Sequence, residues 1–243
     1  MSAPLLSVSQ ARKAFGGLIA VNDVSFEVRV GELIGLIGPN GSGKTTMLNL
    51  ISGALRPTSG EIRLAGSRIS GLPAEMVARA GIARTFQLVR VLPSMTAIEN
   101  VTAGAVFARN RLWGARAHDF ARDLLGQVGL TGRESFPVSE MTYIDQKRVE
   151  LARALAADPQ LLLLDEWLAG LNPSELLIGI NLVRDINREG RTIIMVEHVM
   201  DAIRTLCGRC VVMNSGVKIA DGAASAVLAD PDVIRAYLGD DDA

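Results

Sequence analysis

The sequence predicts an α/β fold in which a mainly parallel sheet is covered on both faces by helices. A glycine-rich turn at 38–45 lies between the apolar segment 32–38 and the helix-like segment 44–51. From Val149 onward, segments with helical spacing alternate with strands that are apolar throughout, as expected of a parallel sheet buried on both sides. The expected helices of this part are 149–157, 174–188 and 201–206, and the expected strands are 161–164, 192–196 and 211–213.

The first 148 residues follow two other patterns. Residues 5–9 and 24–30 alternate apolar and polar side chains, and 61–64 follow a Pro- and Gly-containing turn, which predicts an antiparallel β portion. From about residue 91 to 132, small residues and helical spacing dominate. We therefore expect one domain, with a core subdomain at about 1–87 and 149–243 and an inserted helical subdomain at about 88–148.

Composition narrows the classes of function. The chain has 243 residues, 49% of them hydrophobic but only 4% aromatic, so aliphatic side chains must build the core. A net charge of −1 gives no electrostatic reason to expect nucleic acid as a partner. No secretory signal and no membrane-spanning stretch is visible, so we expect a soluble cytoplasmic protein that can dock on a membrane protein. Cys207 and Cys210 are expected to be reduced thiols that pack in the interior.

The glycine-rich turn is the first site with a defined chemistry. Its sequence, Gly-Pro-Asn-Gly-Ser-Gly-Lys-Thr, matches the pattern G-x-x-x-x-G-K-[ST], in which backbone N–H groups surround phosphate oxygens. Lys44 is expected to reach the β- and γ-phosphates, and the Thr45 hydroxyl to ligate Mg²⁺. The sequence therefore predicts binding of a nucleoside triphosphate. The expected binding residues are Gly38, Pro39, Asn40, Gly41, Ser42, Gly43, Lys44, Thr45 and Thr46.

Two adjacent acids form the second site. Four leucines precede Asp165 and Glu166, which suits a buried strand whose carboxyl end opens on a ligand crevice. Asp165 is expected to hold Mg²⁺, and Glu166 to orient or deprotonate the attacking water.

With these residues in place, the sequence resembles the ATP-binding subunits of ABC transporters over almost its whole length. Gln87, which ends Gly-Ile-Ala-Arg-Thr-Phe-Gln, matches the glutamine that in this family contacts Mg²⁺ and senses the γ-phosphate. His198 matches the switch histidine after a later strand, and 169–172 match the loop that contacts a second subunit. Phe15 lies where the family stacks an aromatic ring on adenine. The resemblance thus implies a P-loop NTPase of the ABC ATPase type that uses ATP and Mg²⁺.

Five segments are similar in particular to the ATPases of branched-chain (hydrophobic) amino-acid importers. The resemblance implies two membrane permease subunits, a paired ATPase subunit and an extracytoplasmic binding protein, with this chain at the cytoplasmic face of the membrane as a peripheral subunit. Substrate choice would lie in those other proteins. The segments are 81–87, 95–101, 169–173, 196–200 and 230–239.

One motif departs from the family. The signature loop, normally Leu-Ser-(Gly/Tyr)-Gly-Gln, aligns with Met-Thr-Tyr-Ile-Asp at 141–145. Thr142 and Tyr143 keep a hydroxyl and the tyrosine, and Thr142 with Asp145 also suits an N-cap for a helix at 146–157. Ile144 replaces glycine and Asp145 adds a negative charge, so we expect a steric obstacle and an uncompensated acid near the other subunit's γ-phosphate.

Trp167 and the segment 88–93 are the two other features for which we expect a role. Trp167 stands where the family usually has proline, and packing at the dimer seam is the one role we expect for it. Residues 88–93 combine apolar side chains with one arginine directly after Gln87, and we expect them to line a groove for a permease helix.

The leading hypothesis is an ATP-driven motor subunit of an importer. The altered signature favours a heterodimer, and a homodimer stays open as the alternative pairing. The alternative is a nucleotide-binding regulatory subunit with little turnover of its own. A soluble ABC protein of DNA repair or translation would show a long coiled-coil insertion or tandem ATPase domains, and this sequence shows neither. A P-loop kinase or GTPase would need an acceptor-binding lid or a base-reading Asn-Lys-x-Asp element, and the sequence shows none.

Overall fold

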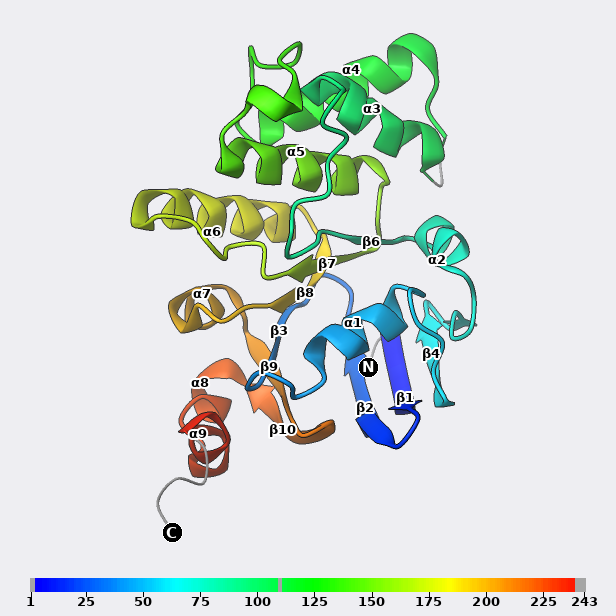
Figure 1. Cartoon of the computed structure of the whole chain (residues 1–243), viewed down its shortest axis with the longest axis vertical. Helices are drawn as coiled ribbons and strands as arrows, with labels where there is room; N and C mark the ends of the chain where they lie inside the picture. Colours follow the sequence, from blue (N-terminus) through cyan, green and yellow to red (C-terminus); the bar gives the residue numbers. More distant parts are fainter. Residues whose placement is uncertain (1–2, 109–110, 239–243) are drawn as a thin grey trace.

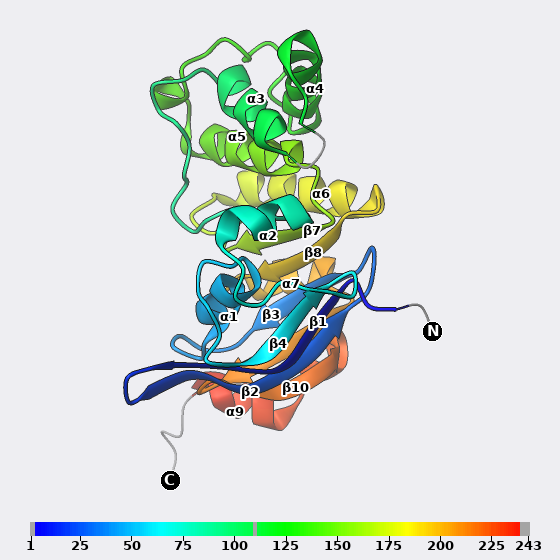
Figure 2. The same cartoon turned by 90° about the vertical axis from the view of Figure 1, so that its right-hand side faces the viewer.

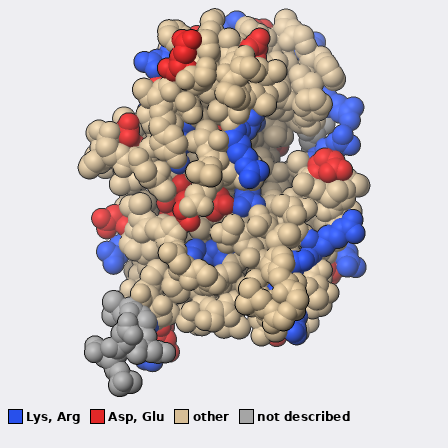
Figure 3. Space-filling model, in the orientation of Figure 1, with Lys and Arg blue, Asp and Glu red and all other residues tan. Residues whose placement is uncertain are grey.

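The computed structural model describes residues 3–108 and 111–238. Gly239, the last residue of one importer-like segment, and the acidic tail at 240–242 lie outside the described residues. Two sheets and the helices around the larger one form the core, and a group of three helices lies at one end (Figures 1 and 2). On the face that Figure 3 shows, acidic and basic side chains are interspersed.

The larger sheet has the strand order β10-β9-β3-β8-β7-β6. The strands from β9 to β6 pair in parallel, and β10 joins the edge antiparallel to β9, which confirms the predicted mainly parallel sheet. Every residue of β3, β7 and β8 is buried, which explains why these strands are apolar except for Thr192 at the start of β8 and Asp165 at the end of β7. The bounds are β3 (Leu33–Ile37), β6 (Ile82–Arg84), β7 (Leu161–Asp165), β8 (Thr192–Val196), β9 (Arg209–Asn214) and β10 (Val217–Ala223).

The second sheet is the expected antiparallel portion, with order β2-β1-β4-β5. Its first two strands form a hairpin that extends past the predicted segments as far as the pair Phe15 and Leu18. The outer half of this hairpin is largely exposed and interrupted by register shifts, so it carries no alternating apolar pattern. The bounds are β1 (Leu6–Phe15), β2 (Leu18–Val28), β4 (Ser59–Leu64) and β5 (Ser67–Arg68).

Most helices flank the larger sheet, while α3, α4 and α5 form the group at the end of the molecule (Figure 1). The sequence analysis missed the short helices α2, α8 and α9 and the strands β5, β6 and β10. No described helix is long and apolar enough to cross a membrane. The helices are α1 (Lys44–Ile51), α2 (Ala74–Ala80), α3 (Ala97–Phe107), α4 (Gly114–Gln127), α5 (Tyr143–Ala156), α6 (Pro173–Arg188), α7 (Met200–Leu206), α8 (Ala224–Val227) and α9 (Pro231–Leu238).

Candidate functional site

Four neighbouring parallel strands bring the predicted polar residues to one edge of the sheet. The glycine-rich loop follows β3, and the next strands in the sheet are β8, β7 and β6. His198 follows β8, Asp165 and Glu166 stand at the end of β7, and Gln87 comes three residues after β6. Because parallel strands end at the same edge, residues up to about 160 positions apart in sequence meet there.

The glycine-rich loop is held closely by its own chain. Gly38 and Gly43 have φ angles of 147° and 102°, a region that residues with a Cβ rarely adopt. A Cβ on Gly43 would lie 2.4 Å from the Ala20 oxygen of β2, and one on Gly38 would lie 2.0 Å from the Met213 oxygen of β9. Glycine is therefore required at both positions by the packing of the loop itself, and not only by the approach of phosphates.

Lys44 begins α1 and is almost fully buried. Its Nζ donates to the oxygens of Gly38 and Pro39 at 2.8 and 2.9 Å. Burial lowers the pKa of Lys44, while the nearby carboxylates of Glu166 and Asp165 oppose that shift. A cavity of about 180 Å³ lies against this lysine. Seven of the nine expected phosphate-binding residues and two of the expected catalytic residues thus share one cavity, which is lined by Ala20, Asn40, Gly41, Ser42, Gly43, Lys44, Thr45, Thr46, Glu166 and His198.

Glu166 is the centre of the polar contacts at this edge. Gln87 donates from Nε2 to Glu166 Oε2 at 2.7 Å. His198 Nε2 lies 2.9 Å from the other carboxylate oxygen, Oε1. Both carboxylate oxygens are thus engaged, each by a side chain that follows a different strand.

The backbone of Glu166 is also unusual. Its φ of 50° is in the left-handed region, which costs a non-glycine residue about 1–3 kcal/mol and persists only where neighbouring contacts hold it. The Glu166 N–H donates to the Val196 oxygen at 2.8 Å, and the Glu166 oxygen accepts from the Ala169 N–H at 3.1 Å. The left-handed turn therefore joins the end of β7 to the end of β8.

Asp165 has a partner that sequence reasoning missed. Arg84, the last residue of β6, donates from Nη2 to Asp165 Oδ2 at 2.6 Å, and both side chains are buried. Arg84 also donates to Asn49 Oδ1 at 2.6 Å, so it fixes the acid to α1. The sequence signal that could have revealed this residue was an arginine within the importer-like segment 81–87.

The donor chemistry suits Mg²⁺ bound mainly through phosphate and water. No group of three or more His, Cys, Asp or Glu side chains in the described ranges could hold a metal ion by itself. Mg²⁺ at phosphate sites usually takes one or two protein oxygens and keeps several waters. The Thr45 hydroxyl, the Asp165 carboxylate and the Gln87 amide supply oxygens of this kind.

Phe15 is not brought to this cavity. It lies at the end of the β1–β2 hairpin, opposite Leu18, with 47% of its surface exposed. Lys13 Nζ lies 5.0 Å from the centre of its ring. Ala20 lines the cavity and lies on β2, the other strand of this hairpin. Phe15 is nearer than Ala20 to the turn of the hairpin and therefore farther from the cavity.

The altered signature residues begin α5, and the structure corrects three expectations about them. The helix starts at Tyr143 rather than at 146, and Thr142 caps it by accepting the Asp145 N–H. Ile144 is buried and does not present a surface obstacle. Asp145 is not uncompensated, because Arg133 and Arg148 pair with its carboxylate at 2.6 and 3.1 Å.

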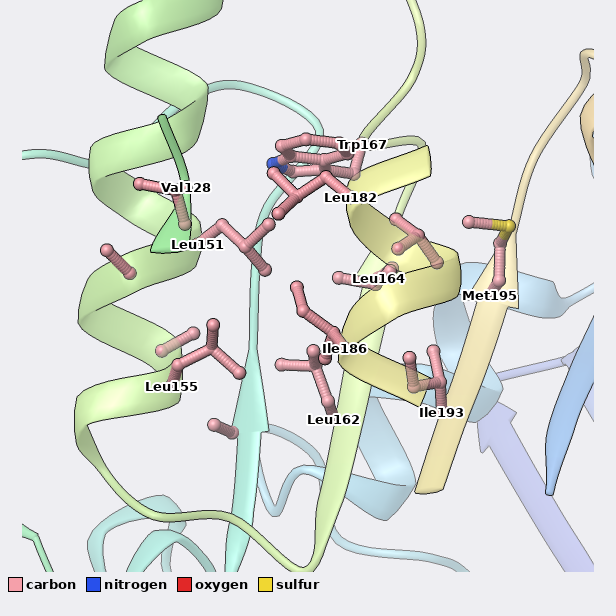
Figure 4. Close-up of a cluster of buried hydrophobic side chains, with 14 of the residues drawn as sticks. Val128, Leu151, Leu155, Leu162, Leu164, Trp167, Leu182, Ile186, Ile193 and Met195 are labelled. Atoms are coloured by element: carbon pink, nitrogen blue, oxygen red, sulfur yellow. The ribbon is translucent and has the colours of Figure 1, made fainter. Parts of the chain in front are cut away.

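Trp167 does not lie at an exposed seam. Its side chain is fully buried in the apolar cluster between α5 and α6, near Leu151 and Leu182 (Figure 4). The indole Nε1 donates to the Lys147 oxygen at 3.2 Å, and Lys147 Nζ donates back to the Trp167 oxygen at 2.9 Å. The expected packing at a dimer seam is therefore wrong, and the residue joins two parts of the same chain.

Glu197 is a second buried charge that sequence reasoning missed. It directly precedes His198, and its Oε1 accepts the Leu168 N–H at 2.6 Å. Burial raises the pKa of Glu197 to about 7, although the Leu168 N–H and the Lys147 ammonium favour the charged form. The available signal was an acid that directly follows a strand whose last four residues are apolar.

The two cysteines behave as expected. Both are free and buried, and both sulfur atoms lie against Gly35 of β3. Burial raises the pKa of both thiols, that of Cys210 to about 11. They are reduced packing residues beneath the strand that leads to the glycine-rich loop.

Two known family models together match most of the chain. The family model described as "ABC transporter" matches residues 21–169, and the one described as "Branched-chain amino acid ATP-binding cassette transporter" matches 217–243. The high-affinity branched-chain amino acid transport ATP-binding protein LivG of Escherichia coli K12 is 39% identical over 99% of this chain and 100% of its own. The corresponding protein BraF of Pseudomonas aeruginosa shows the same identity and coverage.

A solved structure shows the same fold. The ADP conformation of MJ1267, an ATP-binding cassette of an ABC transporter, superimposes with a TM-score of 0.90 and 28% sequence identity. The match covers 98% of this chain and 100% of the other.

The ion pairs of Asp145 predict a measurable contribution to stability. Asp145→Asn keeps the size of the side chain but removes the charge that Arg133 and Arg148 neutralise. We expect the free energy of unfolding to fall by about 1–3 kcal/mol, as measured by urea denaturation. The matched control is Asp185→Asn, which breaks an exposed pair with Arg188 at 3.7 Å and should change stability by less than about 0.5 kcal/mol. Equal small effects of the two changes would contradict the prediction.

Proposed function

The chain belongs to the ABC transporter family of ATP-hydrolysing subunits, and we propose that it drives an importer of branched-chain or other hydrophobic amino acids. The observation that carries the proposal is the set of contacts in which Gln87, Glu166 and His198 meet beside the glycine-rich loop. The importer class is supported by LivG and BraF and by the match at 217–243. These comparisons favour a motor subunit over a regulator without turnover.

We assign the roles in hydrolysis as follows. The N–H groups of the loop and the Lys44 ammonium bind the phosphates of ATP, since both are donors at a helix N-terminus. Thr45, Asp165 and Gln87 hold Mg²⁺, which when bound offsets phosphate charge. Glu166 takes the proton of the attacking water or orients it, and His198 and Gln87 hold its carboxylate. Arg84 holds the Asp165 carboxylate in place.

We place adenine at the exposed ring of Phe15, at the outer end of the hairpin whose Ala20 borders the phosphate cavity. An exposed aromatic ring can stack on a base without any cost of opening the core. In this arrangement the β1–β2 hairpin spans the nucleotide from its phosphates to its base.

We further propose that the chain works at the cytoplasmic face of the membrane with permease subunits, a second ATPase subunit and, indirectly, an extracytoplasmic binding protein. Residues 88–148 would act as a helical subdomain that moves against the core of 1–87 and 149–243. Two regions of the surface are central to this proposal, the segment after Gln87 and the start of α5.

The catalytic roles are separable by mutation. Glu166→Gln should keep the affinity for ATP and lower turnover by about 10²–10⁴-fold, because it removes the general base without removing a phosphate contact. Lys44→Ala should instead weaken nucleotide binding. Equilibrium binding of Mg-ATP and steady-state hydrolysis by the transporter complex measure the two effects independently. Unchanged hydrolysis by Glu166→Gln in an active complex would contradict the assignment of Glu166.

The segment 88–93 has the properties of a docking surface at two positions. Leu88 is 79% exposed and Leu92 is also exposed, whereas Val91 is partly buried against the apolar core. The Arg90 N–H donates to the buried carboxylate of Glu150 on α5 at 2.8 Å, so the segment is fixed to the helical group. We propose that Leu88 and Leu92 contact a cytoplasmic helix of the permease, and that Val91 supports them from inside.

This surface predicts loss of coupling. Leu88→Asp should weaken association with the permease at least about tenfold, because an unpaired charge at an interface costs roughly 2–5 kcal/mol. Binding of ATP by the chain should not change. Co-purification with the permease and solute uptake measure the effect. The control is Val30→Asp, because Val30 is 72% exposed and lies just before β3, at the end of the strands away from the cavity. Normal assembly and uptake with Leu88→Asp would exclude this surface.

The start of α5 supports a heterodimer. The Thr142 hydroxyl oxygen already accepts the Asp145 N–H, and the Asp145 carboxylate is paired with Arg133 and Arg148, so this N–H of the first turn is engaged within the chain and is not free for a phosphate. A second subunit with the usual signature would supply a better contact to the ATP bound by this chain.

Pairing should therefore raise turnover. We expect the isolated chain to hydrolyse ATP slowly and a co-purified partner ATPase to raise the rate at least about fivefold, which corresponds to roughly 1 kcal/mol of improved closure. The increment should disappear when this chain carries Glu166→Gln. Equal rates per site with and without the partner would show that the start of α5 is fully competent.

A further inference from the structure

The left-handed turn at Glu166 is held by three buried side chains that do not line the nucleotide cavity. We propose that Lys147, Trp167 and Glu197 form a clasp that keeps Glu166 in this backbone conformation and ties the start of α5 to the catalytic carboxylate. They are positioning residues, and the inference rests on the proposed role of Glu166. The clasp also gives Trp167 a function that its place in the sequence did not suggest.

Lys147 supplies the cation of the clasp. The residue is fully buried, and its Nζ donates to the Trp167 oxygen at 2.9 Å and lies 3.5 Å from the Glu166 oxygen. It also lies 5.0 Å from the centre of the Tyr143 ring. A buried ammonium must keep its acceptors. The carbonyl group of the left-handed residue and that of the next residue are therefore fixed in direction.

Trp167 makes the link reciprocal. Its indole Nε1 donates to the Lys147 oxygen, while its own oxygen accepts from Lys147 Nζ. The ring is packed in the apolar cluster between α5 and α6, with its nitrogen toward α5 (Figure 4). Proline, which the family pattern has at this position, offers no side-chain donor. The double link is thus a consequence of the tryptophan in this chain.

Glu197 closes the clasp from the side of β8. Its Oε1 accepts the Leu168 N–H at 2.6 Å, and the next residue, His198, contacts the Glu166 carboxylate. Its other oxygen, Oε2, is buried and has no hydrogen-bond partner among the described residues. The turn is consequently held at its N–H groups by β8 and Glu197, and at its oxygens by α5.

The geometry gives the clasp a mechanical consequence. In the backbone conformation that the clasp maintains, the Glu166 carboxylate meets Gln87 and His198. Lys147 is five residues after Thr142, about 7.5 Å along the same helix. A second subunit that presses on the start of α5 therefore acts on the Glu166 backbone through one rigid helix, which links the partner's nucleotide to this chain's catalytic acid.

The test compares variants in the intact transporter complex. The ATP turnover that remains in Glu166→Gln is the turnover that does not depend on this site, and it is subtracted from the turnover of every other variant. Lys147→Met keeps the length and packing of the side chain, and we expect it to lower the Glu166-dependent turnover about tenfold or more, while ATP affinity changes less than about twofold. The control is Lys218→Met, which breaks a surface pair with Asp221 on β10 and should leave both quantities unchanged.

A milder variant keeps the test decisive if Lys147→Met does not fold. Trp167→Phe removes the indole N–H and retains an aromatic ring, and it should also lower turnover without changing ATP affinity. If the clasp acts as a unit, the double variant should lose no more than the larger single loss. Parental turnover in both single variants, or additive losses, would overturn the clasp. Unchanged turnover in Glu166→Gln would instead overturn the proposed role of Glu166.

Discussion

The parallel pairing of β3, β8, β7 and β6 is the constraint on which the rest of the site depends. Each of these strands ends at the same edge of the sheet, so four short loops of distant sequence position become neighbours. The strands are buried on both faces, which fixes their register by packing rather than by the loops. The loops thereby carry the polar residues of the site, while the loop after β7 also places Trp167 in the core.

Burial of charge is the main cost of this arrangement, and ion pairs and hydrogen bonds offset it, although Oε2 of Glu197 has no partner among the described residues. Arg84 pairs with Asp165, Arg133 and Arg148 pair with Asp145, and Lys147 binds two backbone oxygens. Removing one member of such a set leaves the other uncompensated, which is far more costly than the net gain from the pair. The charged groups therefore specify the geometry of the loops more than they add to stability.

At the start of α5, the tertiary structure gives Asp145 another role than the one its sequence position suggests. Asp145 in the sequence is a negative charge in a loop that should receive a phosphate. In the fold it is the acceptor of two arginine side chains and lies beneath the surface. What remains for a second subunit to meet is Thr142 and the exposed ring of Tyr143, on a helix tied through Lys147 to the catalytic turn.

The sequence by itself determined the fold class, the glycine-rich loop and the acids at the end of β7, because each is written in contiguous residues whose spacing follows from local geometry. The resemblance to ABC ATPases added Gln87 and His198, which the structure places against Glu166. The contacts of Arg84, Lys147, Trp167 and Glu197 were decided only by the tertiary structure. Their partners lie between 19 and 81 residues away, and a lone charge or ring in the sequence does not reveal which distant carbonyl or carboxylate it will reach.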